Sequence, residues 1–254
     1  MVMRYLIFIL FLLVAFCACE EEIDAYAGKC GIYFDTKDMR LDTVTVSWGL
    51  KNSELKEQSL MLKVCLFGDV APYDRKFSID VISDLEDTLR AIEGVDYRPF
   101  SVEYTLPALQ AETTINIQLL RTEILQKEAR RFTVRLKETS ELQFLYSRQW
   151  QEDSVTTRLL DIQRVVYMDE NFPMPRWWYM LGPSVFGDYS VKKSIVICDV
   201  MGIDRETWAL GNLASDLSEG YLKYVGKYMH RWLQEHPTED ENDELMEMGP
   251  ASRN

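Results

Sequence analysis

A period-two alternation of apolar residues is the feature that most constrains how this chain can fold. Between Cys30 and Asp169, apolar side chains repeatedly occupy every second position of short runs. Successive side chains of a strand point to opposite faces, so the pattern predicts half-buried β-strands. In DTVTVSW, Val44, Val46 and Trp48 form one face, while threonine and serine form the other. The same alternation occurs in KFSIDVI, TINIQLL and RFTVRLK.

Three further runs complete the predicted strands: CGIYFDT, SLMLKVCLFG and FSVEYTLP. The second is apolar on both faces at its centre, which is typical of a central strand. Turn-forming residues separate the runs, at Gly49–Ser53, Gly68–Tyr73, Gly94–Asp96 and Pro107. About seven short strands at this spacing predict an immunoglobulin-like β-sandwich over residues 30–169, with two sheets that bury their alternating faces against each other.

The composition changes after Asp169. The segment ENFPMPRWWYMLGPSVFGDYS contains three prolines and two glycines, which predict an aromatic-rich loop without a long regular element. The pattern then becomes helical in SVKKSIVICDVMG, where Ser190 is a suitable N-cap and Gly202 a suitable stop. The sequence therefore predicts a helix between these two residues.

A longer helix is predicted between about Leu213 and Leu233, because large apolar residues recur there at three- and four-residue intervals: Leu213, Leu217, Tyr221, Tyr224, Tyr228 and Trp232. Pro237 ends it, and the acidic residues 237–254 predict a disordered tail. The predicted fold class is therefore β-rich (α+β): the sandwich, followed by a small helical module at residues 170–236.

The N-terminal residues 1–18 have the order of a signal peptide, with Arg4, the apolar run Tyr5–Phe16 and the small residue Ala18. A run of this length is short for a transmembrane helix, which needs about 20 apolar residues. Cys19 follows Ala18 directly, as in a bacterial lipoprotein signal, in which that cysteine is acylated and becomes the mature N-terminus. The alternative is an ordinary secreted protein cleaved near Ala18.

An acidic linker at residues 19–29 follows Cys19. Its glutamates, Glu20 to Glu22, cannot enter an apolar phase. The run resembles the export signal of lipoproteins on the outer face of Gram-negative bacteria, although a merely soluble linker has the same composition. We therefore expect an outer-membrane, lipid-anchored protein exposed at the cell surface, with the membrane as a partner through its lipid.

The charge balance limits the other partners. The chain has 28 basic and 41 acidic residues, a formal charge of −13. Nucleic-acid binding depends on neutralising phosphates with Lys and Arg, so no nucleic-acid partner is expected. Three cysteines remain beyond the N-terminal segment, Cys30, Cys65 and Cys198. A Cys30–Cys65 disulfide and buried free thiols both remain open, and no metal or cofactor spacing is present.

Four blocks of the sandwich region, APYDRKFSIDVI, AIEGVDYRP, LPALQAETTINIQLLRTEIL and RRFTVRLKE, occur in order. They resemble an uncharacterised family of lipoproteins encoded near starch-utilisation-type outer-membrane nutrient-uptake genes of gut-type anaerobes. The resemblance implies membership of an uptake complex. Gly94, Asp96 and Tyr97 also resemble the turn of the Calx-β repeat. Its acidic calcium ligands are missing, since Arg121 and the single acid Glu123 follow the next strand, so no Calx-type calcium site is expected.

The sharpest functional hint is the aromatic group Trp177, Trp178 and Tyr179. Sugar rings stack on Trp and Tyr faces, so these residues form a candidate ligand platform. The alternative is burial in a core or domain interface, where aromatic side chains are common.

Catalytic motifs are not found. GPSVFG does not have the Gly-x-Ser-x-Gly spacing of a nucleophile elbow, and the two histidines, His230 and His236, lie near the C-terminus. The preferred hypothesis is a non-catalytic surface lipoprotein, an accessory component of a glycan or nutrient uptake system. The alternatives are a protein-binding adhesion or structural lipoprotein and, third, a glycan hydrolase with an unrecognised carboxylate pair.

Overall fold

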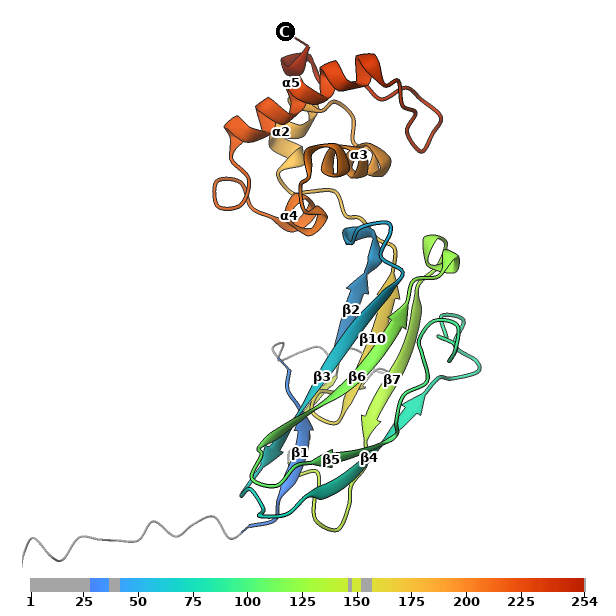
Figure 1. The fold of residues 1–254 in the computed structure, drawn as a ribbon, viewed down its shortest axis with the longest axis vertical. Coiled ribbons are helices and arrows are strands. Elements are labelled where there is room, and N and C mark those ends of the chain that lie inside the picture. The colour runs from blue at the N-terminus through green and yellow to red at the C-terminus, as the bar shows by residue number, and fades with distance from the viewer. Residues whose placement is uncertain (1–27, 37–41, 146–147, 152–156, 254) are drawn as a thin grey trace, which may run out of the picture.

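The computed structural model describes residues 28–36, 42–145, 148–151 and 157–253. The predicted signal peptide 1–18, the lipidation site Cys19 and the linker as far as residue 27 lie outside the described residues. Figure 1 shows strands stacked in two layers and a group of helices at one end of them. Strand β1 (Gly31–Phe34) lies towards the end opposite the helices.

Two sheets form the sandwich. One has the strand order β1-β3-β6, in which β3 is Glu57–Phe67 and β6 is Glu112–Leu120. The other has the order β2-β10-β7-β4-β5, with bounds Thr43–Ser47, Gln163–Asp169, Arg130–Leu136, Arg75–Ile82 and Glu103–Leu106. Neighbours are antiparallel except β2 and β10, which run parallel. A separate two-stranded sheet pairs β8 (Gln149–Gln151) with β9 (Thr157–Leu159) in antiparallel fashion.

The predicted alternating faces make one core between the two sheets. On β6, Ile115, Ile117 and Leu119 are fully buried, and Phe132 and Val134 of β7 are buried opposite them in the same cluster. Burying a side chain of this kind contributes about 1.5–3 kcal/mol. The prediction of a β-rich, immunoglobulin-like sandwich is confirmed, and all seven predicted strands occur as β1 to β7.

Strand β10 was not predicted, although it lies between β2 and β7 in the larger sheet. Its alternation is interrupted because Arg164 occupies a buried position, 3% exposed. The Arg164 guanidinium donates to the carbonyls of Leu160, Gln163 and Phe34 at 2.6, 2.7 and 3.0 Å. Burial lowers the pKa of Arg164 to about 10. A charged residue thus takes the place of an apolar one in the core, because main-chain carbonyl oxygens accept the hydrogen bonds of its guanidinium.

Four α-helices follow the sandwich: α2 (Trp178–Val185), α3 (Val191–Met201), α4 (Arg205–Leu210) and α5 (Glu219–Glu235). Helix α3 confirms its prediction: Ser190 Oγ accepts from the Lys193 amide at 3.0 Å, and Gly202 ends the helix with a φ of 64°. Helix α2 lies in the predicted loop despite Pro183, because its apolar side chains are buried in the helical core. Within the described ranges, no helix is long and apolar enough to cross a membrane.

The prediction of a disordered tail at 237–254 is wrong for the described residues 237–253. Met246 and Met248 are buried at 6% and 1% exposure in the helical core. Ser252, in the 3-10 helix η3 (Pro250–Ser252), donates from Oγ to the Val185 carbonyl at 2.7 Å. The Lys193 ammonium holds the same segment, since it donates to Glu247 O at 3.0 Å. The two buried methionines and these hydrogen bonds hold the acidic segment against the helices, so the helical module extends to residue 253.

Candidate functional site

A cleft of about 720 Å³ lies where the sandwich meets the helical module. One wall is the connection from β2 to β3, whose residues 51–55 we call the junction loop. The other wall is formed by the end of α3 and the start of α4. This junction cleft is lined by Leu50 to Leu55, Cys198, Asp199 and Gly202 to Arg205.

The junction loop begins from a rigid base. Strand β2 continues into the 3-10 helix η1 (Trp48–Leu50), where the Trp48 side chain is fully buried. Gly49 lies so close to the chain after β10 that a Cβ there would meet the Glu170 carbonyl oxygen at 2.5 Å. A glycine is therefore required at this position, and it fixes the loop against the link between the two parts of the protein.

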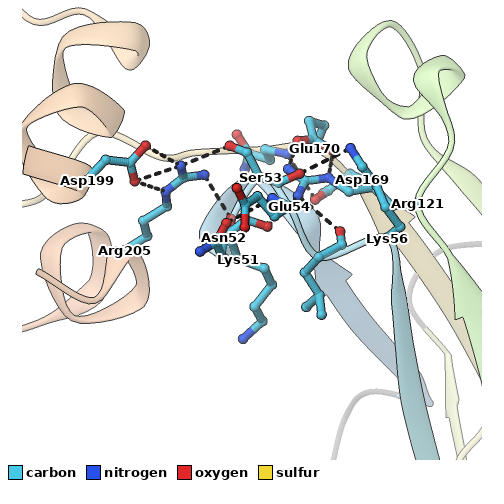
Figure 2. Close-up of polar contacts among 12 residues, drawn as sticks. Lys51, Asn52, Ser53, Glu54, Lys56, Arg121, Asp169, Glu170, Asp199 and Arg205 are labelled. Carbon is cyan, nitrogen blue, oxygen red and sulfur yellow. Dashed lines mark hydrogen bonds and ion pairs between the residues drawn. The ribbon is translucent and has the colours of Figure 1, made fainter. Parts of the chain in front are cut away.

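Arg205 holds the junction loop from the helical side (Figure 2). Its side chain is 5% exposed and donates to the Lys51 carbonyl at 2.8 Å and to Ser53 Oγ at 3.0 Å. The same guanidinium pairs with Asp199 of α3, with Nη2 to carboxylate distances of 2.9 and 3.0 Å. One buried cation thus joins α3, α4 and the junction loop, and charge-assisted hydrogen bonds of this kind are the stronger ones.

Arg121 holds the same loop from the sandwich side (Figure 2). Its side chain, 9% exposed, pairs with Glu170 and donates to the carbonyls of Asn52 and Leu55 at 2.8 and 3.4 Å. The guanidinium also lies 5.9 Å from the centre of the Trp48 ring, within cation–π range. The junction loop is therefore held between two arginines, which fixes the shape of the cleft.

The cleft side chains suit binding by hydrogen bonds and van der Waals contact. The Asp199 carboxylate is engaged with Arg205, and Asp204 caps α4 by accepting from the Thr207 amide at 2.7 Å. Burial raises the pKa of the Cys198 thiol to about 12, so it is not a thiolate at neutral pH. Both aspartates and the cysteine thus have structural environments. Asn52 Oδ1 accepts from the Glu54 amide at 2.8 Å, so the Asn52 amide NH2 and the exposed Glu54 carboxylate remain to face a ligand.

The predicted platform of Trp177, Trp178 and Tyr179 is not assembled. Both tryptophans are 2% exposed, and their rings pack with Phe186 and Trp208. Trp177 Nε1 also donates to the Trp208 carbonyl at 3.1 Å. The segment is helical rather than extended, so both neighbouring rings turn inward, while Tyr179 is 73% exposed. The alternative of core packing is therefore correct for the tryptophans.

The predicted alternatives for the cysteines are also resolved. Cys30, Cys65 and Cys198 are free thiols, of which Cys198 is buried and Cys30 and Cys65 are half-buried. The β1–β3 register places Tyr33, not Cys30, opposite Cys65. The sequence marks the start of the junction loop only as a turn. It carries no signal for Arg121 and Arg205 as loop-holding residues, because the loop carbonyls and Ser53 that they bind are distant in sequence.

Residues 26–203 match a family described as a domain of unknown function, DUF4843. The chain belongs to that family. The DUF4843 match includes the sandwich, α2 and α3, and it ends before α4 and α5. No curated protein matches the sequence.

The solved structures that match this DUF4843 member share little sequence with it. The apo form of the Calx CBD1 domain is 14% identical, with a TM-score of 0.35, and covers 56% of this chain and 99% of its own. A protein of unknown function from Bacteroides ovatus is 15% identical, with a TM-score of 0.33, and covers 57% of this chain and 45% of its own. This chain therefore spans under half of that protein.

Proposed function

We propose that this protein is a membrane-tethered surface lipoprotein that binds a glycan without cleaving it, as an accessory component of an outer-membrane nutrient-uptake system. The observation that carries the proposal is the junction cleft, a preformed concave site held between two arginines. Its volume of about 720 Å³ lies in the range of about 300–1,000 Å³ that is usual for small-ligand sites.

The lining of the junction cleft supports a sugar ligand. Leu50, Leu55 and Ile203 supply apolar contact. Asn52 and Ser53 also line the cleft, and the Ser53 hydroxyl can donate while its oxygen accepts from Arg205. Sugars carry both apolar C–H faces and hydroxyl groups, so they need this mixture. Asp199 and Asp204 already accept hydrogen bonds from Arg205 and Thr207, which leaves Glu54 as the available carboxylate of the lining. Glycoside hydrolysis uses a pair of carboxylates, so this lining supports binding rather than hydrolysis.

The arrangement of the two parts supports the tether. Cys19 precedes β1 in the chain, and the helical module lies at the other end of the sandwich from β1 (Figure 1). A lipid on Cys19 would therefore hold the β1 end towards the membrane and place the junction cleft towards the medium. Two or more acyl chains are needed for a durable anchor of this kind.

The test is affinity electrophoresis of the full-length protein in mild detergent, in gels that contain single dietary or host polysaccharides. We expect one of them to retard the wild type, and Leu55→Arg, which fills the cleft, to abolish the retardation. Leu85→Arg is the matched control, because Leu85 is 83% exposed and lies outside the cleft. Retardation by none of the polysaccharides would reject glycan binding in favour of a protein-binding scaffold. Release of reducing ends would reject the non-catalytic role.

A further inference from the structure

Helix α5 has two apolar faces, and one of them is open to solvent. Its inward face consists of Leu222, Val225, Gly226, Met229 and Leu233. The tyrosine stripe, which we define as Tyr221, Tyr224 and Tyr228, runs along the outer side with exposures of 38%, 55% and 37%. The predicted aromatic face of this helix is therefore mostly a surface feature, and packing within the protein does not account for it.

The rings of the tyrosine stripe are arranged in sequence along the helix. The centroids of Tyr221 and Tyr224 are 6.5 Å apart at an angle of 29°, and those of Tyr224 and Tyr228 are 6.3 Å apart at 42°. Trp232 stacks on His236 at 4.5 Å beyond them. Exposed aromatic rings in a row are suited to a ligand that is itself extended and has apolar faces.

Two cations accompany the stripe at a regular interval. Lys227 follows Tyr224 by three residues, and Arg231 follows Tyr228 by three, so each cation is a neighbour of its tyrosine on the helix surface. Both cations are exposed. The second pair is displaced from the first by four residues, or about 6 Å along the axis. The surface thus repeats an aromatic ring and a positive charge within a chain whose net charge is −13.

We propose that the tyrosine stripe, with Lys227 and Arg231, is a second binding surface, for an anionic polysaccharide such as a uronate-rich chain. The C–H faces of successive sugars would lie on the tyrosine rings, and their carboxylates would meet the two cations. The inference is independent of the junction cleft and of the lipid anchor. A single-stranded nucleic acid is also a polyanion that stacks on aromatic rings, so it is included as an outcome of the test.

The test uses the full-length protein in mild detergent, with polygalacturonate in the gel and neutral amylose as the comparison. We expect polygalacturonate to retard the wild type, and to do so less as salt is raised, because the cations are exposed. Replacing Tyr224 and Tyr228 by alanine should weaken binding by roughly tenfold or more, as truncation of central aromatic anchors does. Lys227→Gln with Arg231→Gln should remove the salt dependence.

Two matched controls separate this surface from general effects. Tyr179→Ala removes another exposed tyrosine, and Lys223→Gln removes a lysine of the same helix that pairs with Glu219. Both should bind as the wild type does, and so should Leu55→Arg in the junction cleft. The proposal is overturned if polygalacturonate does not retard the wild type, if the double tyrosine variant binds unchanged, or if amylose or single-stranded oligothymidylate binds equally well.

Discussion

Two glycines of α5 provide a matched test of how the C-terminal segment packs. Alanine is favoured over glycine in a helix by about 0.8–1.0 kcal/mol. At Gly220 a new Cβ meets no heavy atom within 4 Å, so Gly220→Ala should stabilise the protein by at most about 1 kcal/mol. At Gly226 the new Cβ would lie 2.3 Å from Ser252 Oγ and 2.4 Å from Val185 Cγ1.

The contacts at Gly226 decide whether Gly226→Ala stabilises or destabilises the protein. Ser252 and Val185 are both buried, and Ser252 Oγ donates to the Val185 carbonyl at 2.7 Å, so neither can move without cost. Overpacking of this kind costs about 1–3 kcal/mol, and two close contacts place it at the upper end. After the gain in helix propensity, Gly226→Ala should destabilise the protein by about 2 kcal/mol, or about 4–8 °C in Tm.

Urea unfolding followed by circular dichroism measures both variants. Deleting residues 245–254 from the Gly226→Ala chain should reduce its difference from an equally truncated parent, because the contact with Ser252 is gone while the contact with Val185 remains. A Gly226→Ala protein as stable as Gly220→Ala would refute the packing of Ser252 against α5. Equal effects of Gly226→Ala in full and truncated chains would also refute it.

Three further predictions concern the Arg205 contacts with the junction loop, the pH dependence of stability and the lipid anchor. Arg205→Met should lower the free energy of unfolding by about 2 kcal/mol in urea, because it breaks charge-assisted hydrogen bonds to Lys51 and Ser53. An unchanged unfolding midpoint would contradict the role of Arg205 in holding the junction loop. Burial raises the pKa of Cys198 from 9.0 to about 12, so the unfolded chain releases a proton first and stability falls as pH rises through that interval. Cys198→Ala should show a shallower fall in alkaline thermal melts, and an equal slope would count against it. Cys19→Ala should move the protein from the membrane to the soluble fraction, and continued sedimentation with membranes would exclude the lipid anchor.

Much of the sandwich could be predicted because its strands alternate without interruption. On β6, three consecutive inward positions are apolar, and all three are fully buried. Strand β10 was missed because Arg164 takes a core-facing position, where main-chain carbonyls compensate its charge. Local patterns thus predict a strand well, except where a tertiary contact allows a charged residue at a core-facing position.

The candidate site could not be predicted in the same way. The arginines that shape the junction cleft bind residues far away in sequence, 154 positions apart for Arg205 and Lys51. Every residue has a main-chain carbonyl, so the residue types of these partners do not reveal the contacts in the sequence. Trp177 and Trp178 were given a functional hypothesis because exposure cannot be read from residue type, and a short helix turned both rings into the core.

The hydrogen bonds from Arg121 and Arg205 to main-chain oxygens of the junction loop have an evolutionary consequence. Arg121 and Arg205 grip the carbonyls of Lys51, Asn52 and Leu55, which every amino acid at those positions would supply. The side chains of Asn52, Glu54 and Leu55 can therefore be exchanged while the angle between sandwich and helices is kept, whereas Ser53 must keep an acceptor for Arg205. A protein built in this way can acquire specificity for a new ligand by substitution at these three positions, without rebuilding the contacts that hold the loop.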